Sequence, residues 1–207
     1  GTNGRDFLFG TEGRDKIDAM DGRDYVFAGA GDDIVFGGGG RDEIFGGDGN
    51  DDINAGDGRD WVMGGDGNDL VNGGRGRDKI FGGAGEDTLD GGQGRDKIFG
   101  GADDDLITGG QGKDKIFGGD GNDDIDAGAG NDWVSGGAGD DTIRAGEGRN
   151  DMIAGGAGAD TFVFSAELAE DGARNKTVII DFDVTEDMID LGGATIADIR
   201  EYHHKVE

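Results

Sequence analysis

One aspartate recurs every nine residues along most of this chain. In units counted from Gly1, the sixth position is Asp in each of the first sixteen units, without a gap as far as Arg144. Unit seventeen carries one extra residue, with Asp151 favoured over Asn150 at its sixth position, and unit eighteen ends at Val163. The candidate site residues are Asp6, Asp15, Asp24, Asp33, Asp42, Asp51, Asp60, Asp69, Asp78, Asp87, Asp96, Asp105, Asp114, Asp123, Asp132, Asp141, Asp151 and Asp160.

Carboxylates in such numbers suit either general acid–base catalysis or cation binding. Catalytic carboxylates form a unique pair, whereas these are periodic and identical. The sequence has no Ser-His-Asp constellation and no HExxH zinc-protease motif. Its two histidines, His203 and His204, lie outside the repeat, where we expect a solvated tail. We therefore predict that the chain is not an enzyme and that the carboxylates bind metal, while a catalytic domain elsewhere in a longer protein stays open.

The composition also favours cations as partners. The chain has 207 residues, 49 of them glycine, a formal net charge of −28, and no proline or cysteine. Such a composition is typical of disorder, but disorder would not keep one aspartate in phase. The lack of cysteine excludes disulfides and thiolate metal sites, and the acidity disfavours nucleic acid as a partner. No apolar run reaches the roughly 20 residues that a membrane-spanning helix needs.

The rest of the unit indicates the elements that position the aspartates. Position eight is Leu, Ile or Val in each of the first sixteen units, and the other positions before the aspartate are rich in glycine. Six loop residues with tight turns would alternate with a three-residue strand whose aliphatic side chain points inward. Two units would complete one turn, with odd units in one sheet and even units in the other. The predicted fold is all-β: a parallel β-roll, or solenoid, over residues 1–163.

A roll of this kind needs metal. Its core is one side chain thick per strand, too small to offset the conformational entropy of ordering nine residues per unit. The coil also stacks Asp on Asp about 4.8 Å apart, where like charges repel each other. Calcium suits such loops because it takes oxygen ligands in flexible geometry, whereas magnesium demands a tighter octahedron. We predict a calcium-loaded roll that is unfolded without calcium.

The unit Gly-Gly-x-Gly-x-Asp-x-U-x, with U a large aliphatic residue, resembles the hemolysin-type calcium-binding repeat of RTX proteins over residues 1–163. The resemblance implies that each ion lies between adjacent loops on one side of the roll, giving up to about sixteen calcium ions. The irregular sites are those beside Asp103 and in unit seventeen. The resemblance also implies an extracellular protein of a Gram-negative bacterium, secreted by a type I route. Folding on calcium outside the cell would then support the secretion and stability of a larger protein.

Residues 164–207 differ in composition and are expected to form a partial C-terminal cap. The runs TFVF and VIIDFDVTEDMIDL resemble the segment that follows the repeats in serralysin-type proteases and lipases. We expect a short helical turn at 165–170, a strand at 177–183, a second short apolar segment at 187–191 and a helix at 195–202. Further cap strands and a secretion signal are not recognisable, so we expect the chain to be a fragment.

Ten of the fifteen aromatic residues are predicted on the outer face of the odd-unit sheet. Those at position nine are Phe9, Phe27, Phe45, Phe81, Phe99 and Phe117, with Met63 in the gap. Ladder packing between neighbouring strands would explain this row. An interface would also explain it: self-association, an adjacent domain or, given the lysines at 79, 97 and 115, an acidic polysaccharide. The alternative function is therefore a calcium-dependent carbohydrate-binding or adhesive module.

Overall fold

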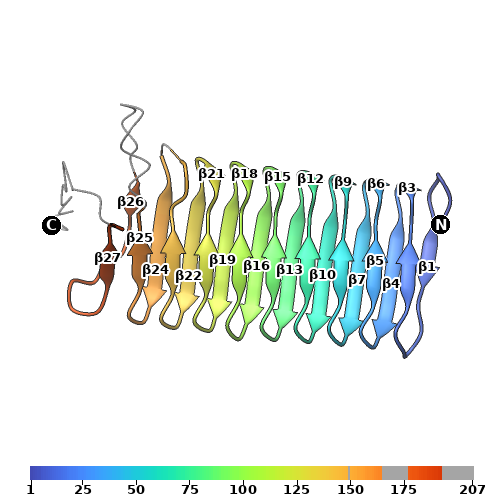
Figure 1. Ribbon diagram of the computed structural model, residues 1–207, viewed down its shortest axis with the longest axis horizontal. Helices are drawn as coiled ribbons and strands as arrows, with labels where there is room; N and C mark the ends of the chain where they lie inside the picture. The colour runs from blue at the N-terminus through green and yellow to red at the C-terminus, as the bar shows by residue number, and fades with distance from the viewer. Residues whose placement is uncertain (149, 165–176, 193–207) are drawn as a thin grey trace, which may run out of the picture.

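The computed structural model of the chain describes residues 1–148, 150–164 and 177–192. Over these residues the chain forms an elongated β-solenoid whose turns follow one another side by side from the N-terminus (Figure 1). The helical segments expected at 165–170 and 195–202 lie outside the described residues, as do His203 and His204. The described part contains no helix long and apolar enough to cross a membrane.

The odd units form a parallel sheet, as predicted, and one strand from beyond the repeats completes its ten strands. Neighbouring strands are in register, so that Ile80 lies beside Ile98 and Phe81 beside Phe99. In spatial order the strands are β1 (Phe7–Phe9), β4 (Tyr25–Ala30), β7 (Glu43–Asp48), β10 (Trp61–Asp66), β13 (Lys79–Ala84), β16 (Lys97–Ala102), β19 (Lys115–Asp120), β22 (Trp133–Ala138), β24 (Met152–Ala157) and β26 (Val178–Ile179).

The even units form a second parallel sheet, also as predicted, and again one strand from beyond the repeats completes its ten strands. Its strands are β2 (Lys16–Asp18), β5 (Ile34–Phe36), β8 (Asp52–Asn54), β11 (Leu70–Asn72), β14 (Thr88–Asp90), β17 (Leu106–Thr108), β20 (Asp124–Asp126), β23 (Thr142–Arg144), β25 (Thr161–Val163) and β27 (Met188–Asp190). All have the predicted three residues. The prediction of three residues was wrong for β4 to β24 of the odd sheet, which have six. These strands run on into the next loop, where Gly83 still pairs with Gly101.

A third parallel sheet, which the sequence did not predict, lies on the loops that lead from even to odd units. Its seven two-residue strands are β3 (Asp21–Gly22), β6 (Gly39–Gly40), β9 (Asp57–Gly58), β12 (Arg75–Gly76), β15 (Gln93–Gly94), β18 (Gln111–Gly112) and β21 (Ala129–Gly130). Two residues are too few for an alternation of apolar and polar side chains to reveal a strand. The pairing comes instead from the stacking of nearly identical loops, whose backbone groups then satisfy one another.

The core is a double column of single side chains, one from each strand. All are at most 1% exposed. The odd sheet contributes Val26, Ile44, Val62, Ile80, Ile98, Ile116, Val134 and Ile153, and the even sheet contributes Val35, Ile53, Val71, Leu89, Ile107, Ile125, Ile143 and Phe162. This thin core confirms the inward position of the aliphatic residue.

The coil imposes its loop conformation even where glycine is absent. Met20 and Asp103 have φ of +73° and +75°, a left-handed region that costs a residue with a side chain roughly 1–2 kcal/mol. The residues one turn later, Gly38 and Gly121, have φ of +97° and +131° at the same positions. The irregular unit at Asp103 therefore keeps the path of the chain.

After the repeats, the chain adds one more strand to each large sheet. β26 pairs beside Met152 and Ile153, and β27 pairs beside residues 161–163. Ile179 and Ile189 thereby continue the two core columns. The strand expected at 177–183 is shorter than predicted, at Val178–Ile179, and the apolar segment expected at 187–191 is β27. A boundary between roll and cap at residue 163 stays a prediction.

The aromatic rings on the outer face of the odd sheet stack on one another. The ring centroids of Phe81 and Phe99 are 4.9 Å apart and those of Phe99 and Phe117 are 4.8 Å apart, with nearly parallel planes. At the gap in the row, Trp61 from position seven inserts between Phe45 and Phe81, at 4.8 and 5.5 Å. The stack is therefore continuous, and ladder packing accounts for the row of phenylalanines.

Candidate metal centre

The predicted aspartates form two columns, each running alongside one of the large sheets where a loop enters a strand. The odd column contains Asp6, Asp24, Asp42, Asp60, Asp78, Asp96, Asp114, Asp132 and Asp151, and the even column contains Asp15, Asp33, Asp51, Asp69, Asp87, Asp105, Asp123, Asp141 and Asp160. The sixteen from Asp24 onward are buried, with at most 3% exposed. Asp151, and not Asn150, continues the odd column. Burial of this many carboxylates requires compensating interactions.

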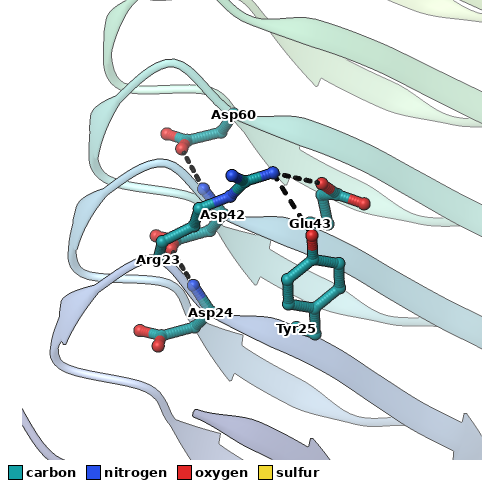
Figure 2. A network of polar contacts seen from close by, with 6 residues as sticks. All are labelled: Arg23, Asp24, Tyr25, Asp42, Glu43 and Asp60. Carbon is teal, nitrogen blue, oxygen red and sulfur yellow. Dashed lines mark hydrogen bonds and ion pairs between the residues drawn. The ribbon is translucent and has the colours of Figure 1, made fainter. Parts of the chain in front are cut away.

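One compensating interaction is a hydrogen bond between turns. From Asp6 to Asp141, the backbone N–H of each aspartate donates to Oδ1 of the column's next aspartate. The N–H of Asp24 is 2.8 Å from Oδ1 of Asp42, and that of Asp42 is 2.8 Å from Oδ1 of Asp60 (Figure 2). Each carboxylate thus has one oxygen fixed by the preceding turn.

The other oxygen has no partner. In the described part of the chain, fifteen aspartate Oδ2 atoms are buried without any hydrogen bond. They belong to Asp24, Asp33, Asp42, Asp51, Asp60, Asp69, Asp78, Asp87, Asp96, Asp105, Asp114, Asp123, Asp132, Asp141 and Asp151. An unsatisfied buried carboxylate oxygen is rare in native proteins and needs an explanation, such as a bound ion. A row of such atoms on each side of the roll therefore indicates cation sites.

The pKa values of most aspartates in the two columns are raised. Burial, opposed by the backbone hydrogen bond and aided by charge from neighbouring aspartates, raises the pKa of Asp60, Asp78 and Asp87 from 3.8 to about 7. The same causes raise the pKa of Asp51 to about 6. Negative charge along the columns is thus costly until a cation compensates it.

The free oxygens lie so close to the loop glycines that a Cβ there would clash with them. A Cβ on Gly82 would lie 2.1 Å from Oδ2 of Asp87, and a Cβ on Gly118 would lie 2.1 Å from Oδ2 of Asp123. Within the described ranges, no three His, Cys, Asp or Glu side chains come together as a metal cluster. An ion beside these oxygens would therefore need backbone carbonyl oxygens as further ligands, a donor set that calcium accepts readily.

Comparison with known families assigns the repeat. The sequence matches the RTX calcium-binding nonapeptide repeat (4 copies) at residues 1–35, 27–62, 63–98, 90–125, 117–150 and 146–165. The matches run without a break over most of the chain. This chain belongs to the RTX calcium-binding repeat family. It is therefore a calcium-binding protein, and RTX repeats are typical of extracellular bacterial proteins.

A solved structure similar to this RTX chain is the crystal structure of a hyperactive, Ca²⁺-dependent, β-helical antifreeze protein from an Antarctic bacterium. The two share 26% sequence identity, over 97% of this chain and 77% of that chain, with a TM-score of 0.43. No curated protein matches the chain.

The two ends of the RTX columns differ from the middle. At the first turn, the hydroxyl and N–H of Thr2 both donate to Asp6, and those of Thr11 both donate to Asp15. The bonds from Thr2 lower the pKa of Asp6, in contrast to the raised pKa values of Asp60 and Asp78. At position two of most other units glycine stands in place of threonine. The first aspartate of each column therefore has protein donors where the interior ones have an unpartnered oxygen.

At the C-terminal end the structure adds an aspartate that the sequence analysis missed. The N–H of Asp160 donates to Oδ1 of Asp187, which extends the even column by one turn. The sequence does indicate this aspartate, because Asp187-Met188-Ile189 is the same tripeptide as Asp151-Met152-Ile153. A search at nine-residue spacing misses Asp187, because a longer connection precedes its strand.

The raised pKa values predict opposite pH dependences with and without calcium. These carboxyl groups have a pKa of 3.8 in the unfolded chain and of about 6 to about 7 in the folded chain, as for Asp42 and Asp78. In a chelator, they therefore stabilise the fold at low pH, and this stability is lost as the pH rises through about 6 to about 7. The chelated chain should therefore gain β-structure between pH 8 and pH 5. With calcium, protons compete with the ion, so stability should fall over the same range. Far-UV circular dichroism as a function of pH checks both expectations. If stability changed with pH in the same direction with and without calcium, the aspartate columns would not be the calcium sites.

Proposed function

We propose that this RTX roll is a non-catalytic folding module of a larger secreted protein, unfolded in the calcium-poor cell and folded by calcium outside it. The observation that supports the proposal is the double row of buried, unpartnered Oδ2 atoms. Without cations, the roll must hold these charges out of water beside one another. Unfolding returns every one of them to solvent, so the metal-free chain favours the unfolded state.

Calcium reverses this balance because it binds only the folded arrangement. Each ion would be held by carboxylates that follow one another in a column, such as Asp60 and Asp78, together with loop carbonyls. With two columns, up to about sixteen ions are proposed, between adjacent loops. Binding free energy then becomes folding free energy, as in small metal-dependent domains. Successive turns contact only their neighbours, so that each bound ion also favours the next turn.

The calcium difference across the cell envelope gives this switch its use. Extracellular calcium modules bind with dissociation constants of about 10⁻⁴–10⁻³ M. Such affinity leaves the chain unfolded inside the cell, which suits a type I route that exports an extended polypeptide. The same affinity is sufficient for folding outside, where the roll would stabilise the protein that carries it.

A titration of free calcium tests the proposal directly. Far-UV circular dichroism and size-exclusion chromatography should show an expanded, disordered chain at submicromolar calcium and a compact, β-rich chain at millimolar calcium. Magnesium at the same concentration serves as the control and should leave the chain expanded, because its octahedral preference fits the loops poorly. A compact β-rich chain in chelator at pH 8 would refute the proposal.

No observation favours the carbohydrate-binding alternative. Binding of sugars or bases to aromatic residues uses the faces of the rings. Here the rings of Phe81, Phe99 and Phe117 stack on one another, with centroids 4.9 and 4.8 Å apart. The aromatic row therefore contributes to the sheet itself.

A further inference from the structure

The two outer faces of the roll carry opposite charge. We define each face by the residues at positions five, seven and nine, which alternate with the inward aspartate and aliphatic side chains. The odd face has ten Lys or Arg and one acidic residue, Glu43; its cations are Arg5, Arg23, Arg41, Arg59, Arg77, Lys79, Arg95, Lys97, Lys113 and Lys115. The even face has three cations and nine acids, which are Asp18, Asp32, Asp52, Glu86, Asp90, Asp104, Asp124, Asp126 and Asp140. In a chain of net charge −28, the odd face is the exception.

Contacts place the position-five cations beside the aromatic rows of the odd face. The guanidinium of Arg5 lies 5.2 Å from the ring centre of Phe7, and that of Arg23 reaches the Tyr25 hydroxyl and Glu43 (Figure 2). Further along, Arg41 and Trp61 line one hollow. The remaining cations follow in register, because the N–H of Arg77 bonds to the turn before it as that of Arg95 does. The odd face is thus a continuous basic strip.

Most of this strip has no internal counter-charge. In the described ranges, the ion pairs of Arg and Lys are Arg23–Glu43, Arg75–Asp57 and Arg144–Asp124. Of these, only Arg23 lies on the odd face. Arg59, Arg77 and Arg95 are exposed and make no ion pair there. The strip could therefore bind an acidic surface whose negative charges have the same spacing as the cations of the strip.

The even face of another copy is such a surface. Both faces belong to the same coil, so their charges recur with the same step of about 4.8 Å along the roll. Two odd faces brought together would oppose cation to cation, whereas an odd face on an even face opposes cation to acid. A face that is eight turns long and five residues wide has an area on the order of 600 Å² per partner, from the spacing of strands and of residues along them. This area is at the lower end of the range for specific protein interfaces.

Calcium decides whether this attraction prevails. Without it, the buried aspartate columns add negative charge directly behind the basic strip and copies repel each other. Bound calcium removes this repulsion, because about sixteen Ca²⁺ ions would carry a charge of about +32 against a chain of −28. We propose that calcium-loaded rolls associate face to face, the basic odd face of one copy on the acidic even face of the next. The contact joins different surfaces, so it does not close and gives open stacks. The inference rests on calcium-driven folding as proposed above.

Sedimentation velocity in millimolar calcium, with circular dichroism on the same samples, tests the inference. The average mass should rise with protein concentration at low salt, fall toward the monomer as salt screens the charges, and be that of the monomer in chelator. Replacing Arg59, Arg77 and Arg95 by Gln should raise the concentration needed for association by about tenfold, or about 1.4 kcal/mol. Arg75→Gln is the control for loss of an exposed arginine, because Arg75 lies off both faces, although unlike Arg77 it pairs with Asp57.

Charge reversal distinguishes stacking from other partners. Arg59→Glu, Arg77→Glu and Arg95→Glu together should abolish association, and adding Asp52→Lys, Asp90→Lys and Asp126→Lys on the even face should restore it. A folded wild type that stays monomeric at every concentration overturns the inference but leaves the proposed function intact, whereas a chain that calcium does not fold overturns both. Association that survives the triple reversal also overturns it. So does a monomer whose basic strip binds heparin instead, which would indicate a polyanionic ligand.

Discussion

Replacing Gly83 with alanine should open the roll near its centre even in saturating calcium. Gly83 has φ of +136°, and a Cβ there would lie 1.9 Å from the backbone oxygen of Gly65 in the adjacent strand. The backbone strain alone costs about 1–3 kcal/mol, and the overlap also separates β10 from β13. Because each turn is held mainly by its neighbours, the defect should divide one cooperative unfolding transition into two.

Gly13→Ala is the matched control. No atom lies within 4 Å of a Cβ at Gly13, so its effect on the free energy of unfolding should stay within about 0.5 kcal/mol. Thermal unfolding followed by circular dichroism in calcium compares the two variants. A Gly83→Ala variant as stable as Gly13→Ala would mean that the strands do not pack as closely as described.

Replacing Asp78 with asparagine should change stability in opposite directions with and without calcium. Asparagine keeps an oxygen that can accept the N–H of Asp60, as Oδ1 of Asp78 does at 2.7 Å, but removes the charge. With calcium, loss of a carboxylate ligand should destabilise the roll by roughly 3 kcal/mol, as when one partner of a buried ion pair is removed. In chelator at pH 8 the variant should be more stable than wild type. There it no longer buries a carboxylate whose pKa is raised to about 7.

The comparison needs conditions in which the chelated chain is partly folded. Sucrose favours the compact state without replacing calcium, so the folded fraction at several sucrose concentrations gives the sign of the effect. Asp52→Asn, an exposed substitution on the even face, should change neither condition by more than about 0.5 kcal/mol. If Asp78→Asn shifts stability in the same direction with and without calcium, Asp78 contributes only through its hydrogen bond.

The architecture was predictable because the same short pattern of aspartate and aliphatic residue recurs many times in the sequence. A single Asp-x-Ile unit would be ambiguous, but sixteen in phase determine which residues face inward and which strands are neighbours. The two large sheets, the inward aliphatic column and the alignment of Asp78 with Asp96 all follow from this phase. Parallel pairing in register leaves no other arrangement in which every unit is equivalent.

Features that depend on backbone geometry were not predictable. The hydrogen bond from one aspartate N–H to the next carboxylate, the third sheet and the six-residue odd strands all arise from the exact path of the loops. Asp187 joins its column only because the chain returns to the even sheet after the repeats. The charge difference between the faces can be found in the sequence only if odd and even units are compared separately, that is, with a period of eighteen residues. At position five, the odd unit then has Arg59, whereas the even units before and after it have Asn50 and Asn68.

The central claim is that the unpartnered Oδ2 atoms of the two aspartate columns are calcium ligands. Its most direct test is an anomalous difference map from crystals of the calcium-loaded chain. We expect two rows of calcium peaks, one along each column, with a step of about 4.8 Å and each next to an Oδ2 atom such as that of Asp78 or Asp87. A map with no peaks along the columns, or with peaks only at exposed carboxylates such as Asp52, would contradict it.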